Sequence, residues 1–109
     1  MSTIWVVSDT GHEYSKAEGR GTLRFLFTGK VNVFASDMLV KEIESKLEEA
    51  TEEDYLLPSG NAVANCLAFT SLLNRFSKVN VLIFSFKHET YEVRTIRKSQ
   101  FKTASREVA

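Results

Sequence analysis

Residue types that define whole classes of protein are scarce in this sequence. It holds one cysteine (Cys66), one proline (Pro58) and two histidines in 109 residues. A lone cysteine excludes a disulfide framework. Two histidines and one cysteine without ligand spacing also argue against a metal site built from side chains. We therefore expect no metal, no cofactor and a reducing, cytoplasmic environment.

Long apolar runs are missing as well. No segment approaches the roughly 20 apolar residues of a membrane-spanning helix. Residues 1–7 lack the basic segment and the long apolar segment of a signal peptide, and residues 4–7 are already a β-branched and aromatic run typical of a strand. The sequence thus predicts a cytoplasmic protein that does not engage a membrane.

Net charge is absent too, because the charges sum to zero at pH 7. A neutral chain gives no reason to expect a long nucleic acid as partner. Locally, acidic residues gather in 37–54 and basic residues in 75–109. One interpretation is a solvated helix face and a solvated tail. The other is a pair of complementary patches that meet in a homodimer, or a basic rim for an anionic ligand.

The apolar periodicity predicts strands and helices in an α/β order. We expect helices over 37–50 and 62–76, and strands over 4–7, 23–27, 31–34, 55–57, 79–86 and 91–96. Residues 23–27 and 31–34 flank a glycine and are interpreted as a hairpin. The second helix is apolar nearly all round, which predicts that it is buried, with Cys66 in the core.

The order strand-strand-strand-helix-strand-helix-strand-strand predicts a single small α/β domain over residues 1–96. Alternation of strand and helix in the middle implies a parallel core, and hairpins at the ends imply antiparallel edges of a mixed sheet. Residues 97–109 are polar and basic, without an apolar period after Phe101, and are predicted to be a flexible tail.

Two polar segments each follow a predicted strand and are candidates for a ligand site. The first is Ser8-Asp9-Thr10-Gly11-His12, and the second is Ser59-Gly60-Asn61, which opens the second helix. The carboxyl ends of parallel strands share one edge of a sheet, and a helix N-terminus favours an anion. Ser36 could join the same edge. The competing interpretation is structural, with Ser59, Asn61 or Ser36 capping helices and the glycines permitting turns.

Short motifs also resemble known proteins. The run Phe34-Ala35-Ser36-Asp37-Met38-Leu39 and the turn at Gly60 resemble the viral ring-nuclease family, the type III anti-CRISPR proteins. This resemblance implies a small dimeric α/β protein that binds and cleaves cyclic tetra-adenylate. That family has Gly-His where this chain has Gly60-Asn61, so His12 would have to replace the catalytic histidine. Gly11-His12-Glu13-Tyr14-Ser15 separately resembles small uncharacterised bacterial or phage proteins.

Taken together, the sequence predicts a small homodimeric binding protein for an anionic, nucleotide-type ligand at the strand-end loops. The ligand could be a cyclic nucleotide signal that the protein sequesters. One alternative is a metal-independent phosphodiesterase in which His12 is the general acid or base. Another is a protein–protein interaction module without a small ligand.

Overall fold

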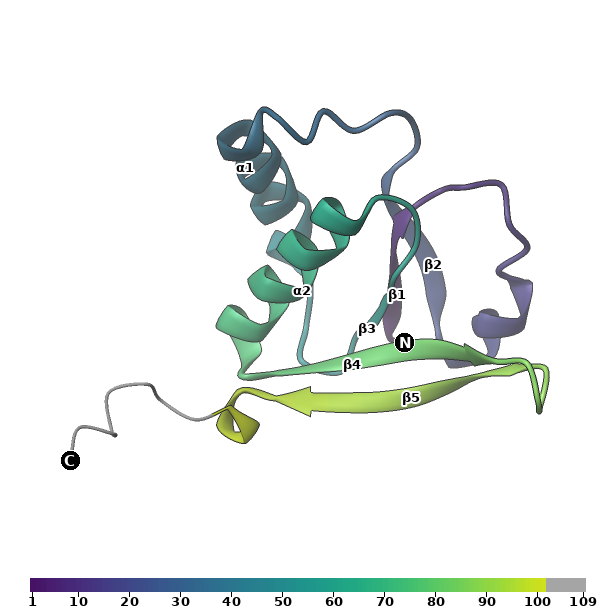
Figure 1. Cartoon of the computed structure of the whole chain (residues 1–109). Coiled ribbons are helices and arrows are strands. Elements are labelled where there is room, and N and C mark those ends of the chain that lie inside the picture. The colour runs from purple at the N-terminus through teal and green to yellow at the C-terminus, as the bar shows by residue number, and fades with distance from the viewer. Residues whose placement is uncertain (102–109) are drawn as a thin grey trace.

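The computed structural model describes residues 1–101, which form one mixed sheet with helices packed on it (Figure 1). The strands are β1 (Thr3–Ser8), β2 (Thr22–Phe27), β3 (Tyr55–Leu57), β4 (Lys78–Ser85) and β5 (Thr90–Arg97). The helices are α1 (Ser36–Lys46) and α2 (Ala62–Phe76), with 3₁₀ turns at Ser15–Arg20, Leu47–Glu49 and Lys98–Gln100. The predicted α/β class is confirmed.

The strand order in the sheet is β2-β1-β3-β4-β5. β1 pairs in parallel with both β2 and β3, β3 pairs in parallel with β4, and β5 returns antiparallel to β4. The predicted parallel core is therefore present, with one antiparallel edge formed by the β4–β5 hairpin. None of the helices within residues 1–101 is long and apolar enough to cross a membrane.

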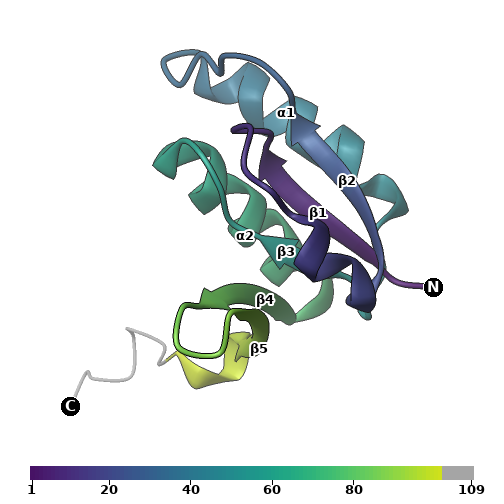
Figure 2. The same cartoon turned by 90° about the vertical axis from the view of Figure 1, so that its right-hand side faces the viewer.

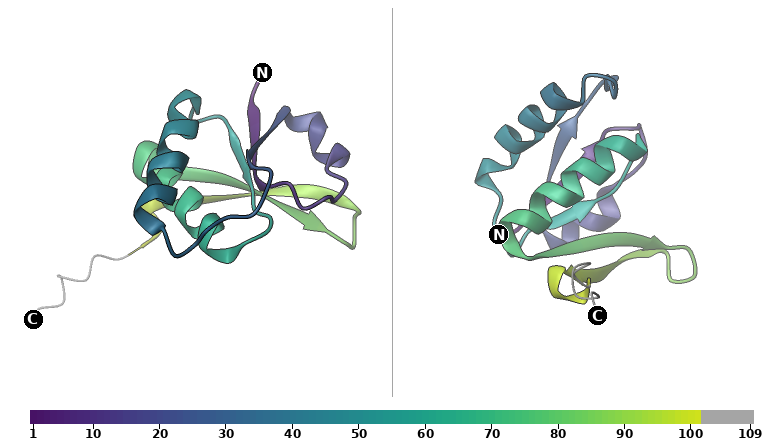
Figure 3. Two further views of the ribbon diagram at one scale, coloured as in Figure 1. Left: turned by 90° about the horizontal axis from the view of Figure 1, so that it is seen from above. Right: turned by 60° about the vertical axis from the view of Figure 1, so that its left-hand side comes forward.

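The two faces of the sheet are covered differently. α1 and α2 pack on one face, where Trp5, Leu56 and Leu72 belong to one apolar cluster. The opposite face carries Ile4 and Leu57, and the 3₁₀ helix Ser15–Arg20 packs there through Ala17. Figure 2 shows this short helix in front of β1 and β2 with α1 and α2 behind them, and the view from above in Figure 3 shows the same layers.

One predicted strand does not form. Residues 31–34 lie in the loop between β2 and α1, and β2 pairs in parallel with β1 instead of forming a hairpin. The side chain of Asn32 accepts a hydrogen bond from the Phe34 N–H at 3.1 Å, and its carbonyl accepts one from Ala35. These bonds make a turn into α1, where an Asn side chain competes with sheet pairing. Phe34 is 95% exposed as a result.

The second helix has the predicted bounds but is not buried all round. Its buried residues are Ala64, Ala68, Ser71 and Leu72, which form one face. Cys66 and Val63 are exposed, so the predicted core position of Cys66 is wrong. At the other end of the domain, Arg97 ends β5, Lys98–Gln100 form a 3₁₀ turn, and residues 102–109 of the predicted tail lie outside the described residues.

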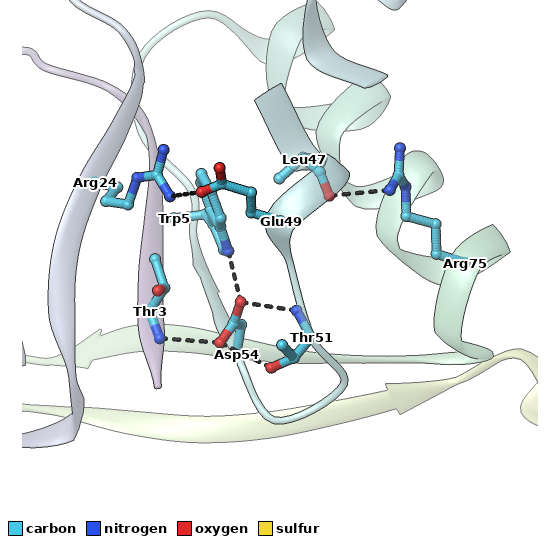
Figure 4. Close-up of polar contacts among 8 residues, drawn as sticks. All are labelled: Thr3, Trp5, Arg24, Leu47, Glu49, Thr51, Asp54 and Arg75. Carbon is cyan, nitrogen blue, oxygen red and sulfur yellow. Dashed lines mark hydrogen bonds and ion pairs between the residues drawn. The ribbon is translucent and has the colours of Figure 1, made fainter. Parts of the chain in front are cut away.

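A buried carboxylate joins the amino ends of β1 and β3. Asp54 accepts hydrogen bonds from the Thr3 N–H at 2.9 Å, the Trp5 Nε1–H at 3.0 Å, and the N–H and hydroxyl of Thr51 at 2.9 and 3.1 Å (Figure 4). Only 8% of Asp54 is exposed. This residue ends an acidic run that the sequence suggested to be solvated, and the structure gives it a structural role instead.

Candidate functional site

The connections from β1 and β3 leave the sheet in opposite directions. β1 continues into the 3₁₀ helix on one face, whereas neighbouring β3 continues into α2 on the other face. Ligands of open α/β sheets bind outside the carboxyl ends of the strands at such a reversal. The topology therefore selects the carboxyl edge between β1 and β3, which is the edge chosen from the sequence.

A pocket of about 800 Å³ lies at this edge. Its volume falls in the range of about 300–1,000 Å³ typical of small-molecule sites. The lining combines the loop after β1, the loop after β3 and the carboxyl half of β4 with Tyr91 of β5: Thr10, His12, Glu13, Tyr14, Leu57, Pro58, Ser59, Gly60, Leu82, Ile83, Phe84, Phe86 and Tyr91. Segments far apart in the sequence thus border one open pocket.

The pocket exists because β3 is short and β4 is long. The last pair between these strands is Leu56 with Val81, after which Pro58 and the loop turn away towards α2. β4 continues to Ser85, and over those last residues it pairs only with β5 among the described strands. The extension of β4 beyond β3 forms the apolar wall of the pocket.

One serine clamps the two loops together. The Ser59 hydroxyl donates to the Ser8 carbonyl at 2.7 Å and accepts from the Ser8 N–H at 2.9 Å. Asn65 in α2 fixes Ser59 in turn, accepting from its N–H and donating to its carbonyl, both at 2.9 Å. The loop after β3 is therefore held against the end of β1 without any ligand.

A tyrosine orders the loop after β1. Tyr14 is 6% exposed, and its hydroxyl lies 2.7 Å from the Thr10 hydroxyl and donates to the Ser8 carbonyl at 3.3 Å. Its ring packs on Phe25, with ring centroids 5.8 Å apart. The pocket wall formed by the loop is thus anchored in the core below it, which makes the site largely preformed.

The residues predicted from the sequence divide into three groups. Thr10, His12, Ser59 and Gly60 line the pocket. Ser8 lies buried beneath Gly60, and its hydroxyl has no hydrogen-bond partner among the described residues. The remaining predicted residues do not line the pocket. They are Asp9 and Gly11, joined by a turn hydrogen bond of 3.1 Å, Asn61, which caps α2, and Ser36, the first residue of α1.

Asn61 has the structural role that the sequence left open as an alternative. Its side-chain oxygen accepts from the N–H groups of Val63 at 2.8 Å and Ala64 at 3.2 Å. These are two of the donors that a bound anion would use at a helix N-terminus. An anion at α2 would therefore rely on the helix dipole and the remaining amides.

We expect Asn61→Ala to lower the free energy of unfolding by about 1 kcal/mol, because the cap of α2 is lost. Asn61→Asp is the matched control, since it keeps an acceptor at the cap. Urea denaturation followed by the fluorescence of Trp5 measures both. Equal stability of the alanine variant and the parent chain would contradict the capping role.

The polar groups of the pocket are few and carry little positive charge. No Lys or Arg lines it within residues 1–101. Hydrogen bonds from the N–H and then the hydroxyl of Ser15 lower the pKa of Glu13, so this carboxylate is ionised at neutral pH. Burial, with a smaller effect of Tyr14, raises the pKa of Tyr91 and keeps its phenol neutral. His12 is exposed, and no described residue hydrogen-bonds its ring.

Sequence reasoning missed the aromatic wall. Phe84 contacts Phe86 and Tyr91 edge-to-face, with ring centroids 5.1 and 5.2 Å apart. Leu82 and Phe84 alternate along β4, Phe86 continues the same spacing one residue beyond the strand, and Phe84 is the cross-strand partner of Tyr91. The period-two spacing, the short strand over 55–57 and the longer strand over 79–86 were predicted from the sequence, but the register that leaves the end of β4 without β3 beside it was not.

Comparison with known proteins identifies the family of the chain. Residues 6–97 match the family described as Phage Pam3 gp32-like protein. The match spans both helices, β2 to β5 and every residue that lines the pocket. Searches of curated proteins and of solved structures returned no match. The chain therefore belongs to the Phage Pam3 gp32-like protein family, a family of phage proteins.

Proposed function

We propose that this phage protein binds a small nucleotide-type molecule in the pocket at the carboxyl edge of β1 and β3. The observation that carries the proposal is the position of an aromatic-lined pocket of about 800 Å³ at the reversal of the strand connections. Such a position is where open α/β sheets bind nucleotides, and aromatic rings offer a stacking surface to any base.

The lining supports one orientation of such a ligand. The planar base lies against the wall formed by Phe84, Phe86 and Tyr91, which is the most apolar part of the pocket. The anionic part points towards His12 and the first turn of α2, where the helix dipole favours negative charge. The clamp between Ser8 and Ser59 holds both loops in place, which reduces the entropy lost on binding.

Binding without cleavage is the version that the geometry favours. A general base is oriented by a second group, and His12 has no hydrogen-bond partner among the described residues. Sequestration of a cyclic nucleotide signal in a homodimer is a narrower form of the proposal, whereas the ring-nuclease resemblance implies a dimer that binds and cleaves cyclic tetra-adenylate. It is tested by including cyclic tetra-adenylate among the ligands and by measuring the molar mass in solution.

We expect Phe86→Ala to weaken nucleotide binding roughly tenfold or more, because stacking of one base on an aromatic side chain is worth about 1–3 kcal/mol. Phe86 is 87% exposed, so its loss leaves the stability nearly unchanged. Phe34→Ala is the matched control, because Phe34 is 95% exposed and lies outside the pocket. Isothermal titration with mononucleotides and cyclic nucleotides measures the affinities.

Three outcomes would overturn this proposal or part of it. If no nucleotide binds or shifts the melting temperature, the chain is better explained as a protein–protein interaction module. Equal losses for Phe86→Ala and Phe34→Ala would place the ligand elsewhere. Recovery of cut ligand after incubation would replace binding by the phosphodiesterase alternative, and His12→Ala should then abolish turnover more than binding.

A further inference from the structure

Within residues 1–101, the side chains that line the pocket offer a phosphate no Lys or Arg, so its binding would rest on His12 and the dipole of α2 alone. Among the residues within 1–101 that line the pocket, Glu13 is the one acidic side chain, and hydrogen bonds from Ser15 lower its pKa, so its carboxylate is ionised at neutral pH. The two cations of the 3₁₀ helix Ser15–Arg20, Lys16 and Arg20, have protein partners. Arg20 donates to the Tyr91 carbonyl at 3.2 Å, and Lys16 lies 4.0 Å from Glu89 and 5.8 Å from the centroid of the Phe84 ring.

The walls favour an uncharged ring instead. Leu57, Leu82, Phe84 and Tyr91 form an apolar surface that is buried or partly buried, and Phe86 beside them is 87% exposed. Phe84 contacts Phe86 and Tyr91 edge-to-face. The exposed ring of Phe86 therefore remains able to stack against a planar ligand. A planar heterocycle fits this surface without bringing a charge into it.

Glu13, an exposed residue of the loop after β1, also lines the pocket. Its carboxylate accepts from the Ser15 N–H at 2.9 Å, which holds the group in place. An ionised carboxylate only accepts hydrogen bonds and has about four acceptor positions, so the bonds from the N–H and hydroxyl of Ser15 leave capacity for a ligand. Guanine has two adjacent N–H donors on one edge, whereas adenine presents a donor beside an acceptor there. A bidentate pair of this kind discriminates strongly against the wrong base.

We propose, resting on the function above, that the pocket recognises guanine through Glu13 and the aromatic wall, and that the phosphate adds little. Guanosine then binds nearly as tightly as guanosine monophosphate. Adenosine binds at least roughly tenfold more weakly than guanosine, because its acceptor faces the carboxylate.

The test is isothermal titration of the full chain with guanosine, guanosine monophosphate, inosine, adenosine and adenosine monophosphate. We expect guanosine and its monophosphate to agree within about threefold, and inosine, which lacks one donor, to lie between guanosine and adenosine. Glu13→Gln should reduce the preference for guanosine over adenosine by roughly tenfold. Glu18→Gln is the matched control, because Glu18 is exposed on the 3₁₀ helix that follows Glu13 and does not line the pocket.

The outcomes separate this inference from the proposed function. If the monophosphate binds and guanosine does not, the phosphate dominates and the guanine proposal is wrong, while nucleotide binding stands. Equal affinities for guanosine and adenosine, or an unchanged preference in Glu13→Gln, also overturn the guanine proposal alone. If no nucleoside or nucleotide binds, both proposals fail.

Discussion

Replacing Asp54 by alanine is expected to lower the free energy of unfolding by about 3–5 kcal/mol, because several buried donors lose their acceptor at once. The Trp5 indole and the N–H groups of Thr3 and Thr51 all donate to this carboxylate. Urea denaturation measures the change, with circular dichroism as the probe because the substitution alters the surroundings of Trp5. Glu53→Ala, an exposed neighbour, should change stability by less than about 0.5 kcal/mol.

The same residue makes stability depend on pH. Burial alone raises the pKa of Asp54, but the hydrogen bonds from Thr3, Trp5 and Thr51 outweigh it and hold the pKa below its ordinary value. The folded pKa thus lies below the unfolded one, so the contribution is complete above the unfolded value of about 3.9 and is lost as the pH falls through the folded pKa. In Asp54→Ala, the free energy of unfolding should therefore fall less steeply as the pH decreases. Parallel pH profiles for the variant and the parent chain would contradict the assignment.

Gly60→Ala is expected to lower the free energy of unfolding by about 2–5 kcal/mol and to distort the pocket. Gly60 has a φ of +76°, a conformation that costs other residues about 1–2 kcal/mol. A β-carbon there would lie 2.7 Å from Cβ and 2.9 Å from Oγ of Ser8, and such overpacking adds about 1–3 kcal/mol. Urea denaturation followed by Trp5 fluorescence measures the loss.

Two further variants isolate the causes at Gly60. Gly29→Ala is the matched control, because no atom lies within 4 Å of its β-carbon position and its φ is not positive. The double variant Gly60→Ala with Ser8→Gly removes the overlap but keeps the backbone strain, so it should recover part of the stability. A cost below about 1 kcal/mol for Gly60→Ala would contradict the close packing of the two loops.

Much of the fold could be predicted because local signals agreed with the tertiary structure. α2 spans Ala62–Phe76 as predicted, since Asn61 caps it and an apolar face runs along it. The apolar run of β4 and the strand-helix alternation led correctly to a parallel core. The parallel pairing of β1 and β3 then places the loops that contain His12 and Gly60 beside one pocket, as the sequence suggested.

The features of the fold and the site that the sequence did not predict depend on contacts that the local sequence does not specify. Residues 31–34 alternate as a strand would, yet the side chain of Asn32 turns the chain into α1. Asp54 ends a run of acidic residues, and its burial depends on Trp5, which is 49 positions away in the sequence. The aromatic wall requires β4 to extend beyond β3, a matter of register between strands. Only the sheet as a whole determines these features.

The central claim is that the pocket between the loops after β1 and β3 binds a nucleotide-type ligand. The most direct test is an ¹H–¹⁵N correlation spectrum of the labelled full chain during titration with guanosine monophosphate. We predict saturable shifts confined to the amides of residues 10–14, 59–60 and 82–86, the segments that line the pocket. No shifts at millimolar ligand, or shifts centred on the exposed residues Phe34 and Met38 of the distant loop and α1, would contradict the claim.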